Sequence, residues 1–254
     1  MAEYTVQVFK DMAAVARAAA EVFIDLAAQA QGENRPFRVA LAGGKTPNAL
    51  YALLASPAYR SWVDWEGVSF FFGDERAVPP DHPDSNYRMA NEALFRPLGL
   101  PAARVHRMRA EVGELDAAAE AYENELRSAF GNSMPQFDLV LLGMGSDGHT
   151  ASLFPGHPAL QERKRWVAPV ADAPKPPPRR LTLTVPVLNA AKLVLFLVTG
   201  VDKAEALREG LHGTMSPEQC PAKYIRPGPE RLRWLVDEAA GALLSYSSQR
   251  GRLA

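Results

Sequence analysis

FDLVLLGMGSDGHTASLFPGH, residues 137–157, is the stretch of sequence that decides the fold. Its first part, Phe137–Leu142, is an apolar run with the length and composition of a buried strand. Three glycines then follow within six residues, which is typical of a turn whose backbone comes very close to another group. His149 comes directly after this turn. Because open α/β sheets place their chemistry at the carboxyl ends of buried strands, the stretch predicts both a central strand and a site.

Two interpretations of His149 are open from its position alone. A single histidine in a loop often does no more than cap that loop. Here Asp147 lies two residues earlier, with Gly145 and Gly148 on either side of it, and this context favours a catalytic imidazole. The glycine spacing also matches the dinucleotide-binding motif, but that motif needs a long helix after the third glycine. Pro155 limits any helix here to about a turn and a half, so we reject a dinucleotide site.

A second glycine turn follows the apolar run Phe37–Ala42, which reads as another buried strand. The turn consists of Gly43, Gly44, Lys45, Thr46 and Pro47. Thr46 fits a helix N-cap and Pro47 the first helical position, so backbone N–H groups and the positive end of a helix dipole meet at one point. Val39 stands where a Walker A loop needs a glycine, so we expect a monophosphate site. An ordinary strand–helix turn is the alternative.

A third strand is predicted over Val68–Phe72, and it stops at Gly73. Asp74-Glu75-Arg76 follows directly. Charged groups after three phenylalanines are costly to bury without a purpose, which makes them candidates for a site. An ion pair at the edge of the sheet is the alternative.

A fourth strand, Lys192–Val198, ends close to Gly200. The helix expected over Asp202–Leu211 carries Lys203 in its first turn, where a cation is unfavourable unless an anion compensates it. Crossover connections put the carboxyl ends of all parallel strands on one edge of the sheet, so the four glycine turns should converge. The side chains and turns expected at the resulting pocket are Gly44, Lys45, Thr46, Asp74, Arg76, Asp147, His149, Arg180 and Lys203.

The remaining pattern alternates strands and helices without a break in composition. Further strands are expected at residues 4–9, 105–108, 181–185 and, less regularly, 222–225, and helices at residues 11–31 (capped by Asp11), 84–95, 112–130 and 229–245. The last helix should turn Trp234 and Leu235 inward, and Ala171–Arg180 reads as a stiff proline-rich loop with a basic end. We therefore predict one doubly wound α/β domain over residues 1–254, with a mainly parallel sheet.

The bulk composition excludes several classes of protein. The net charge is −1 and the pI is near 6.5, so no basic excess is present to hold nucleic acid or an anionic membrane. One cysteine, Cys220, suits a reducing compartment, and the absence of a signal-peptide pattern or a membrane-length apolar run predicts a cytoplasmic protein. The five histidines show no metal-binding spacing, so we expect no metal site.

Five segments of the sequence resemble the 6-phosphogluconolactonases, which belong to a wider family that includes glucosamine-6-phosphate deaminase. The matching segments are LAGGKTPNALY (41–51), FFFGDERAVPPDHPDSNYRMA (70–90), the opening stretch (137–157), RRLTLTVPVLNAAKLVLFLVTGVDKAEAL (179–207) and RLRWLVDEAAGALL (231–244). They cover most of the chain in the right order. One departure is Lys45, which stands where the family usually has serine.

The resemblance implies a Rossmann-like α/β/α fold and hydrolysis of 6-phospho-D-glucono-1,5-lactone to 6-phospho-D-gluconate in the oxidative pentose phosphate pathway. His149 would be the general base, and Asp147 would either orient it or hydrogen-bond the sugar hydroxyls. The phosphate would be held by Thr46, the Gly43–Gly44 backbone, Arg180 and Lys203, with Arg76 joining them or polarising the carbonyl. Lys45, Asp74 and Gly145 complete the expected substrate-binding set, and Arg179 competes with Arg180. No cofactor, metal or covalent nucleophile is implied, and the chain is expected to be a monomer or weak homodimer.

Two rival functions remain open. An aldose–ketose isomerase or deaminase on the same fold would act on a sugar phosphate and commonly uses a carboxylate base. The deaminase branch carries a glutamate soon after its DGH segment, whereas residues 150–157 here contain no acid, which favours hydrolysis. A sugar-phosphate sensor without catalysis is the second rival, but the chain has no spare segment for a DNA-binding module.

Overall fold

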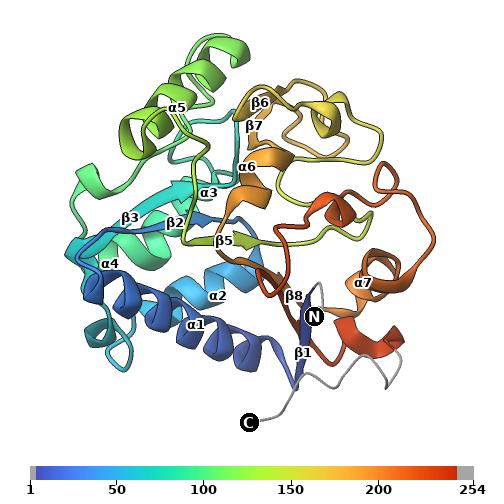
Figure 1. Ribbon diagram of the computed structural model, residues 1–254, viewed down its shortest axis with the longest axis horizontal. Helices are drawn as coiled ribbons and strands as arrows, with labels where there is room; N and C mark the ends of the chain where they lie inside the picture. The colour runs from blue at the N-terminus through green and yellow to red at the C-terminus, as the bar shows by residue number, and fades with distance from the viewer. Residues whose placement is uncertain (1–3, 245–254) are drawn as a thin grey trace.

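The computed structural model describes residues 4–244, and within that range six parallel strands form a central sheet (Figure 1). In spatial order the strands are β1 (Thr5–Phe9), β9 (Leu232–Asp237), β8 (Val194–Val198), β5 (Leu139–Leu142), β2 (Phe37–Leu41) and β3 (Val68–Phe72). The inner strands are almost entirely buried, as expected for a parallel sheet covered on both faces. The predicted parallel sheet is confirmed, together with the strands expected near residues 4–9, 37–42, 68–72, 137–142 and 192–198.

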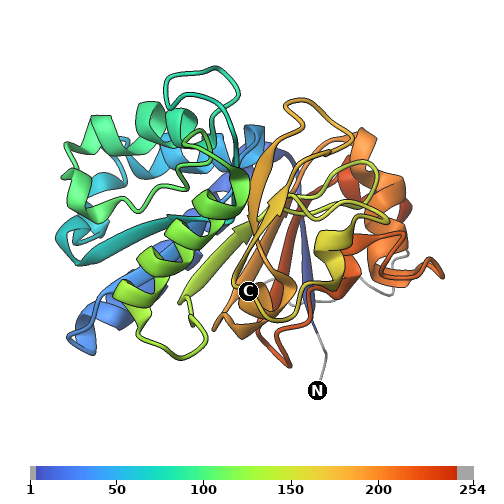
Figure 2. The ribbon, with the colours of Figure 1, turned by 90° about the horizontal axis from the view of Figure 1, so that it is seen from above.

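Helices cover both faces of this sheet, so the doubly wound architecture is also confirmed (Figures 1 and 2). α1 (Met12–Gly32) and α2 (Lys45–Leu54) pack together on one face, while α5 (Leu115–Phe130) and α6 (Val185–Ala190) lie on the other. Asp11 caps α1 as predicted, because its Oδ1 accepts a hydrogen bond from the Ala14 N–H at 2.8 Å. Within the described range, no helix is both long and apolar enough to cross a membrane.

The shorter helices differ in detail from the prediction. The segment expected as one helix over residues 84–95 is α3 (Asn86–Ala90), a π turn (Asn91–Phe95) and α4 (Arg96–Leu98), and the segment after β8 is a 3-10 turn (Val201–Lys203) followed by α7 (Ala204–His212). Other 3-10 turns span Arg60–Trp62, Trp65–Gly67, Ala102–Arg104, Pro158–Gln161, Pro221–Tyr224 and Ala240–Leu243. Residues 105–108 form no strand, only a single bridge from Val105 to Phe70.

The predicted start of α2 was two residues late. The helix begins at Lys45 with Gly44 as its N-cap, so Thr46 is not the cap and Pro47 is not the first residue. Gly44 has φ of 110°, which glycine adopts without strain, and this lets the helix begin immediately after the turn. The Thr46 hydroxyl lies instead 2.7 Å from the hydroxyl of Thr199, beyond the end of β8.

The prediction for the end of the chain was wrong. Residues 232–237 form β9 between β1 and β8 and are not helical. Where a strand was expected over residues 222–225, the chain forms a 3-10 turn over Pro221–Tyr224. Trp234 stacks on Phe196 of β8 with ring centroids 3.8 Å apart. Pairing on both sides and this aromatic contact outweigh the helical propensity of the alanine-rich residues that follow. Ser245, the last residue of the expected helix, lies outside the described residues.

A second, antiparallel sheet carries two of the site segments, and the sequence did not predict it. Its strands are β4 (Asp74–Arg76), β7 (Arg180–Leu183) and β6 (Val167–Val170), in that order. Only β7 matches an expected strand, because β4 is a charged tripeptide and β6 contains a proline, and neither has the usual strand pattern. The pairing aligns Arg76 with Arg180, which are 104 residues apart by number.

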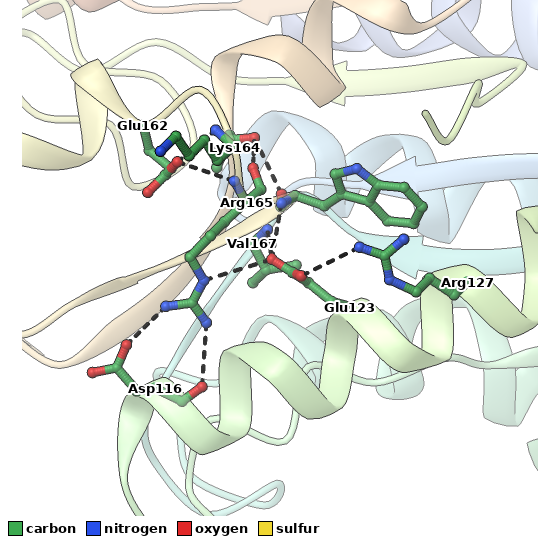
Figure 3. A network of polar contacts seen from close by, with 9 residues as sticks. Asp116, Glu123, Arg127, Glu162, Lys164, Arg165 and Val167 are labelled. Atoms are coloured by element: carbon green, nitrogen blue, oxygen red, sulfur yellow. Dashed lines mark hydrogen bonds and ion pairs between the residues drawn. The ribbon is translucent and has the colours of Figure 1, made fainter. Parts of the chain in front are cut away.

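Helix α5 fixes the small sheet through a polar network (Figure 3). The Glu123 carboxylate accepts hydrogen bonds from the backbone N–H groups of Trp166 and Val167, at 2.9 and 3.1 Å. Arg165 pairs with Asp116 at the start of α5, with 2.7 Å between Nη1 and Oδ1. Because β6 pairs with β7, this anchoring also sets the position of the loop and the arginine that enter the site.

Candidate active site

The central sheet has a topological switch point between β2 and β5. From β2 the chain crosses to β3, whereas from β5 it proceeds to β8 and β9 on the other side. The turns after β2 and β5 therefore diverge and leave a crevice, which is where open α/β sheets bind their ligands. A cavity of about 350 Å³ lies there, lined by the turns after β2, β3 and β5 and by the loop before β7.

Most of the predicted site residues line this cavity, so their predicted convergence is confirmed. They are Gly43, Gly44, Asp74, Arg76, Gly145, His149, Arg180 and Lys203. The other three are placed differently. Lys45 is exposed at the start of α2, Thr46 is buried against Thr199, and Asp147 lies against His149, outside the cavity lining.

His149 is held by its own turn and by Phe154. The backbone closes the turn through the Gly145 N–H, which donates to the His149 carbonyl at 2.8 Å, and the ring packs on Phe154 with centroids 4.6 Å apart. Nδ1 lies 2.5 Å from Oδ1 of Asp147. Among residues 4–244 no hydrogen bond is formed by Nε2, so this nitrogen is free to act on a ligand in the cavity.

The Asp147 carboxylate is shared between two cationic or potentially cationic groups. Its Oδ1 contacts His149, and its Oδ2 lies 3.0 Å from the ammonium of Lys175. Partial burial raises the pKa of the Asp147 carboxyl, but its hydrogen bonds to His149 and Lys175 and the charges of these groups hold that pKa well below its ordinary value. Asp147 is therefore ionised throughout the neutral range and can fix the imidazole by accepting a hydrogen bond from its Nδ1–H.

Gly145 allows this pair to form. A Cβ built on Gly145 would overlap with the His149 ring and with the Asp147 carboxylate. Glycine is needed here for close approach, since this position carries no positive φ.

Asp74 is fixed by two side chains from other parts of the chain. Its Oδ2 accepts a hydrogen bond from the Ser152 hydroxyl at 2.7 Å, and its Oδ1 accepts one from the Asn86 amide at 3.1 Å. A Cβ on Gly43 would overlap with the Asn86 amide, so Gly43 makes room for the group that holds Asp74. The carboxylate is buried, yet it still reaches the cavity wall.

Arg180 is 3% exposed and most of its donors are already used. Nε donates to the carbonyl of Pro177 at 2.8 Å, and Nη2 donates to those of Lys175 and Pro176 at 2.9 and 3.3 Å. Arg179, the competing residue, is exposed, lies 3.8 Å from Glu114 and does not line the cavity.

Two further cations reach the cavity. Arg76 donates from Nη1 to the Asp84 carbonyl at 2.7 Å, and Lys203 lies 3.0 Å from Asp202. In the part of the chain that the structure describes, no three His, Cys, Asp or Glu side chains are grouped as a metal site. The cavity thus combines an imidazole–carboxylate pair with an excess of positive charge, an arrangement suited to acid–base chemistry on an anionic ligand.

A family model described as glucosamine-6-phosphate isomerases/6-phosphogluconolactonase matches residues 10–234. The chain belongs to this family. It is 45% identical to the 6-phosphogluconolactonase of Synechocystis sp. over 206 residues, which cover 80% of this chain and 82% of that protein. The human 6-phosphogluconolactonase is 42% identical over 224 residues, covering 86% and 85%. A solved 6-phosphogluconolactonase from Trypanosoma cruzi has a TM-score of 0.84 and 31% identity, covering 95% of this chain and 97% of that one.

The sequence analysis missed three residues of the candidate active site: Lys175, Asn86 and Ser152. Lys175 was visible as a cation inside the proline-rich loop, but only the basic end of that loop was considered. Ser152 lies three residues after the DGH segment and Asn86 ten residues after the DER segment. A short polar side chain near a charged motif is a usable signal for a residue that supports a buried carboxylate.

Proposed function

We propose that the chain acts as a 6-phosphogluconolactonase, hydrolysing 6-phospho-D-glucono-1,5-lactone to 6-phospho-D-gluconate in the oxidative pentose phosphate pathway, with His149 as general base. The observation that carries this proposal is the imidazole of His149, which lines the cavity, contacts Asp147 through Nδ1 and, within residues 4–244, forms no hydrogen bond through Nε2. The names of the relatives support the same reaction.

The chemistry requires only one proton acceptor. His149 donates a hydrogen bond from Nδ1–H to the Asp147 carboxylate, so its Nε2 carries the lone pair. This nitrogen takes a proton from a water as the water oxygen bonds to the lactone carbonyl carbon. When the tetrahedral intermediate collapses, the bond from that carbon to the ring oxygen breaks. The imidazolium returns its proton to the ring oxygen, which gives the open-chain acid. A lactone is an activated ester, so neither a covalent nucleophile nor a metal is needed.

The phosphate is assigned to the opposite part of the cavity. The backbone at Gly43–Gly44 and the amino terminus of α2 provide N–H donors, and Lys203 and Arg76 add positive charge. Arg76 alternatively polarises the carbonyl. Arg180 remains in this assignment, but it has fewer N–H groups left for the phosphate, because its guanidinium already donates to three backbone carbonyls. Lys45 and Thr46 lie outside the cavity lining, so they contact the substrate only if it extends beyond the cavity. Asp74 lines the cavity and is assigned to the sugar hydroxyls.

Replacement of the base tests the proposal directly. In His149→Ala we expect kcat to fall by about 10²–10⁴-fold, the usual contribution of a general base, with a smaller change in KM. The assay is acid release from freshly generated phospholactone, measured against spontaneous hydrolysis. His212→Ala, an exposed histidine at the end of α7, is the control and should match the parent. A folded His149→Ala protein with near-normal kcat would contradict the proposal and transfer the base role to Asp74 or Asp147.

An isomerase or deaminase acting on a sugar phosphate is the second candidate, because the matching family model covers both activities. Residues 150–157, next to His149, carry no carboxylate for that chemistry. Incubation with glucosamine 6-phosphate or ribose 5-phosphate distinguishes the two, and binding without turnover would indicate the sensor.

Three broader expectations also remain proposals: one domain over residues 1–254, a cytoplasmic location and a monomer or weak homodimer. The location is supported by the single, buried cysteine, which suits a reducing compartment. Sedimentation equilibrium tests the oligomeric state, and limited proteolysis tests the domain.

A further inference from the structure

The loop between β6 and β7 brings one cation directly to the catalytic pair. Lys175 lies in this loop, with Nζ 3.0 Å from Oδ2 of Asp147 and 3.5 Å from Nδ1 of His149. Its side chain is 42% exposed and lines the cavity. Asp147 therefore has one oxygen on the imidazole and the other on an ammonium group.

The position of Lys175 is imposed by the loop. Arg180 donates to the carbonyl of Lys175 and to the carbonyls of the two prolines after it, and the Ala173 N–H donates to the Pro178 carbonyl at 2.9 Å. The guanidinium is buried, so these bonds are shielded from water. The loop is thus pre-organised to hold the ammonium against Asp147.

The physical problem that this contact solves is the protonation state of His149. A carboxylate beside an imidazole orients it, but it also stabilises the imidazolium form, which has no lone pair to accept a proton. A cation on the far oxygen of the same carboxylate offsets that field while leaving the hydrogen bond in place. Orientation and basicity can then be retained together.

We propose that Lys175 is a positioning residue that offsets the charge of Asp147, so that His149 is oriented by the carboxylate yet remains unprotonated and able to act as a base. This inference rests on the proposed function, since it concerns the same reaction. Lys175 need not touch the substrate: it acts through Asp147 on His149.

Other charged groups face His149 from the elements around the cavity. They are Asp74 and Arg76 from β4, Arg180 from β7 and Lys203 from the turn before α7. Within residues 4–244, no hydrogen bond or ion pair joins any of these four to the imidazole or to Asp147. Asp74 is itself balanced by the neighbouring positive charge of Arg180. Lys175 is therefore the cation that the geometry couples to the His149–Asp147 pair.

The test is the pH dependence of kcat/KM for Lys175→Met and Lys175→Arg. In Lys175→Met we expect the acid limb of the profile to move up by about one pH unit, the lower part of the range for a charge lost within 4–6 Å. At acid pH, kcat/KM of Lys175→Met should be about tenfold below that of the parent. At pH values above the acid limb, the two should be nearly equal. Lys175→Arg keeps the charge and should restore most of the profile. The substrate phosphate titrates in the same range, but it does so equally for every variant.

Lys164→Met is the matched control, because this lysine is exposed, lies outside the cavity and carries the same change in net charge. Its profile should follow the parent. Thermal unfolding of each variant shows whether the fold is retained.

A second readout needs no substrate. The ring signals of His149, assigned by their loss in His149→Gln, are followed by NMR as a function of pH, and their midpoint should move in the same direction in Lys175→Met. This readout separates the two proposals, because it stands even if His149→Ala retains activity.

Two results would overturn the inference. One is a rate loss in Lys175→Met of equal size at every pH with an unmoved NMR midpoint, which would mean a structural role. The other is a raised KM with an unchanged pH profile, which would make Lys175 a phosphate ligand.

Discussion

At the scale of single residues, the site depends on contacts that leave no spare volume. Gly145 approaches the imidazole and the carboxylate so closely that a methyl group there would displace both. Asp147 is held by two partners at once, so its charge is part of the stability of the turn as well as of its chemistry.

The first prediction concerns Gly145→Ala. The added Cβ should push His149 away from its working position and lower kcat by about 10²-fold, which is the order expected for a misplacement of about 1 Å. The fold should persist, because the overlap is with side chains at a turn and no core group is involved. Gly143→Ala is the comparison, since a Cβ at that position meets no atom within 4 Å, and its loss should be smaller. Equal losses in the two variants would contradict this account of Gly145.

The second prediction concerns Asp147→Asn and acid. The pKa of Asp147 is lowered in the folded state, so its contribution to stability is complete above the unfolded pKa of about 4 and disappears as the pH falls through the lower folded value. Asp147→Asn should therefore be less stable than the parent at pH 6, and the difference should shrink at pH 3 and below. Urea midpoints at the two pH values measure this. A difference that is constant or grows in acid would contradict the assigned sign.

At the scale of elements, the irregular loop from β6 to β7 is important for the site because it carries Lys175 to Asp147. It begins at a strand fixed by α5 and ends at a strand that pairs with β4, so both of its ends are held by the small sheet. Arg180 is the first residue of β7 and folds its guanidinium back onto the loop carbonyls. Its role in the loop is therefore separable from any contact with phosphate.

This distinction gives the third prediction, a comparison of Lys203→Ala with Arg180→Ala. Within residues 4–244, Lys203 pairs only with its neighbour Asp202 and holds no loop carbonyl. Loss of a charge-assisted hydrogen bond of about 1.5–3 kcal/mol to the phosphate should therefore appear as a KM about ten- to a hundredfold higher, with kcat little changed. Arg180→Ala should lower kcat as well, because the loop that carries Lys175 loses its anchor. Unphosphorylated gluconolactone should escape the effect of Lys203→Ala. A pure KM effect in both variants would show that Arg180 serves the phosphate alone.

At the scale of the whole molecule, the site exists because the sheet changes winding direction between β2 and β5. The four strand ends that meet there come from segments that span more than half of the chain, and the second sheet closes one side of the opening. The groups gathered at this point are an imidazole, carboxylates and cations, without a third ligand that would complete a metal site in the described residues.

The fourth prediction follows from this composition. Activity should survive exhaustive treatment with EDTA, because a lactone is activated enough for a water deprotonated by His149. The measurement is the initial rate before and after chelation, with the metal content of the protein determined in parallel. A loss that Zn²⁺ or Mn²⁺ restores would make Asp147 and His149 metal ligands.

The sequence by itself determined the parts whose causes are local. Buried strands can be recognised as apolar runs that end at glycines, and parallel strands share one carboxyl edge. These two features were enough to predict the cavity and its charged or titratable lining residues other than Lys175. The His149–Asp147 pair was also within reach, because both residues belong to one turn and are two positions apart.

Only the tertiary structure decided the features that join distant segments. β9 is a strand because β1 and β8 offer it partners on both sides, against the helical propensity of the residues that follow it. The pairing of β4 with β7, the support of Asp74 by Ser152 and the contact of Lys175 with Asp147 join groups 28 to 108 positions apart. Burial and hydrogen bonding in the folded state select these contacts, and no periodicity along the chain encodes them.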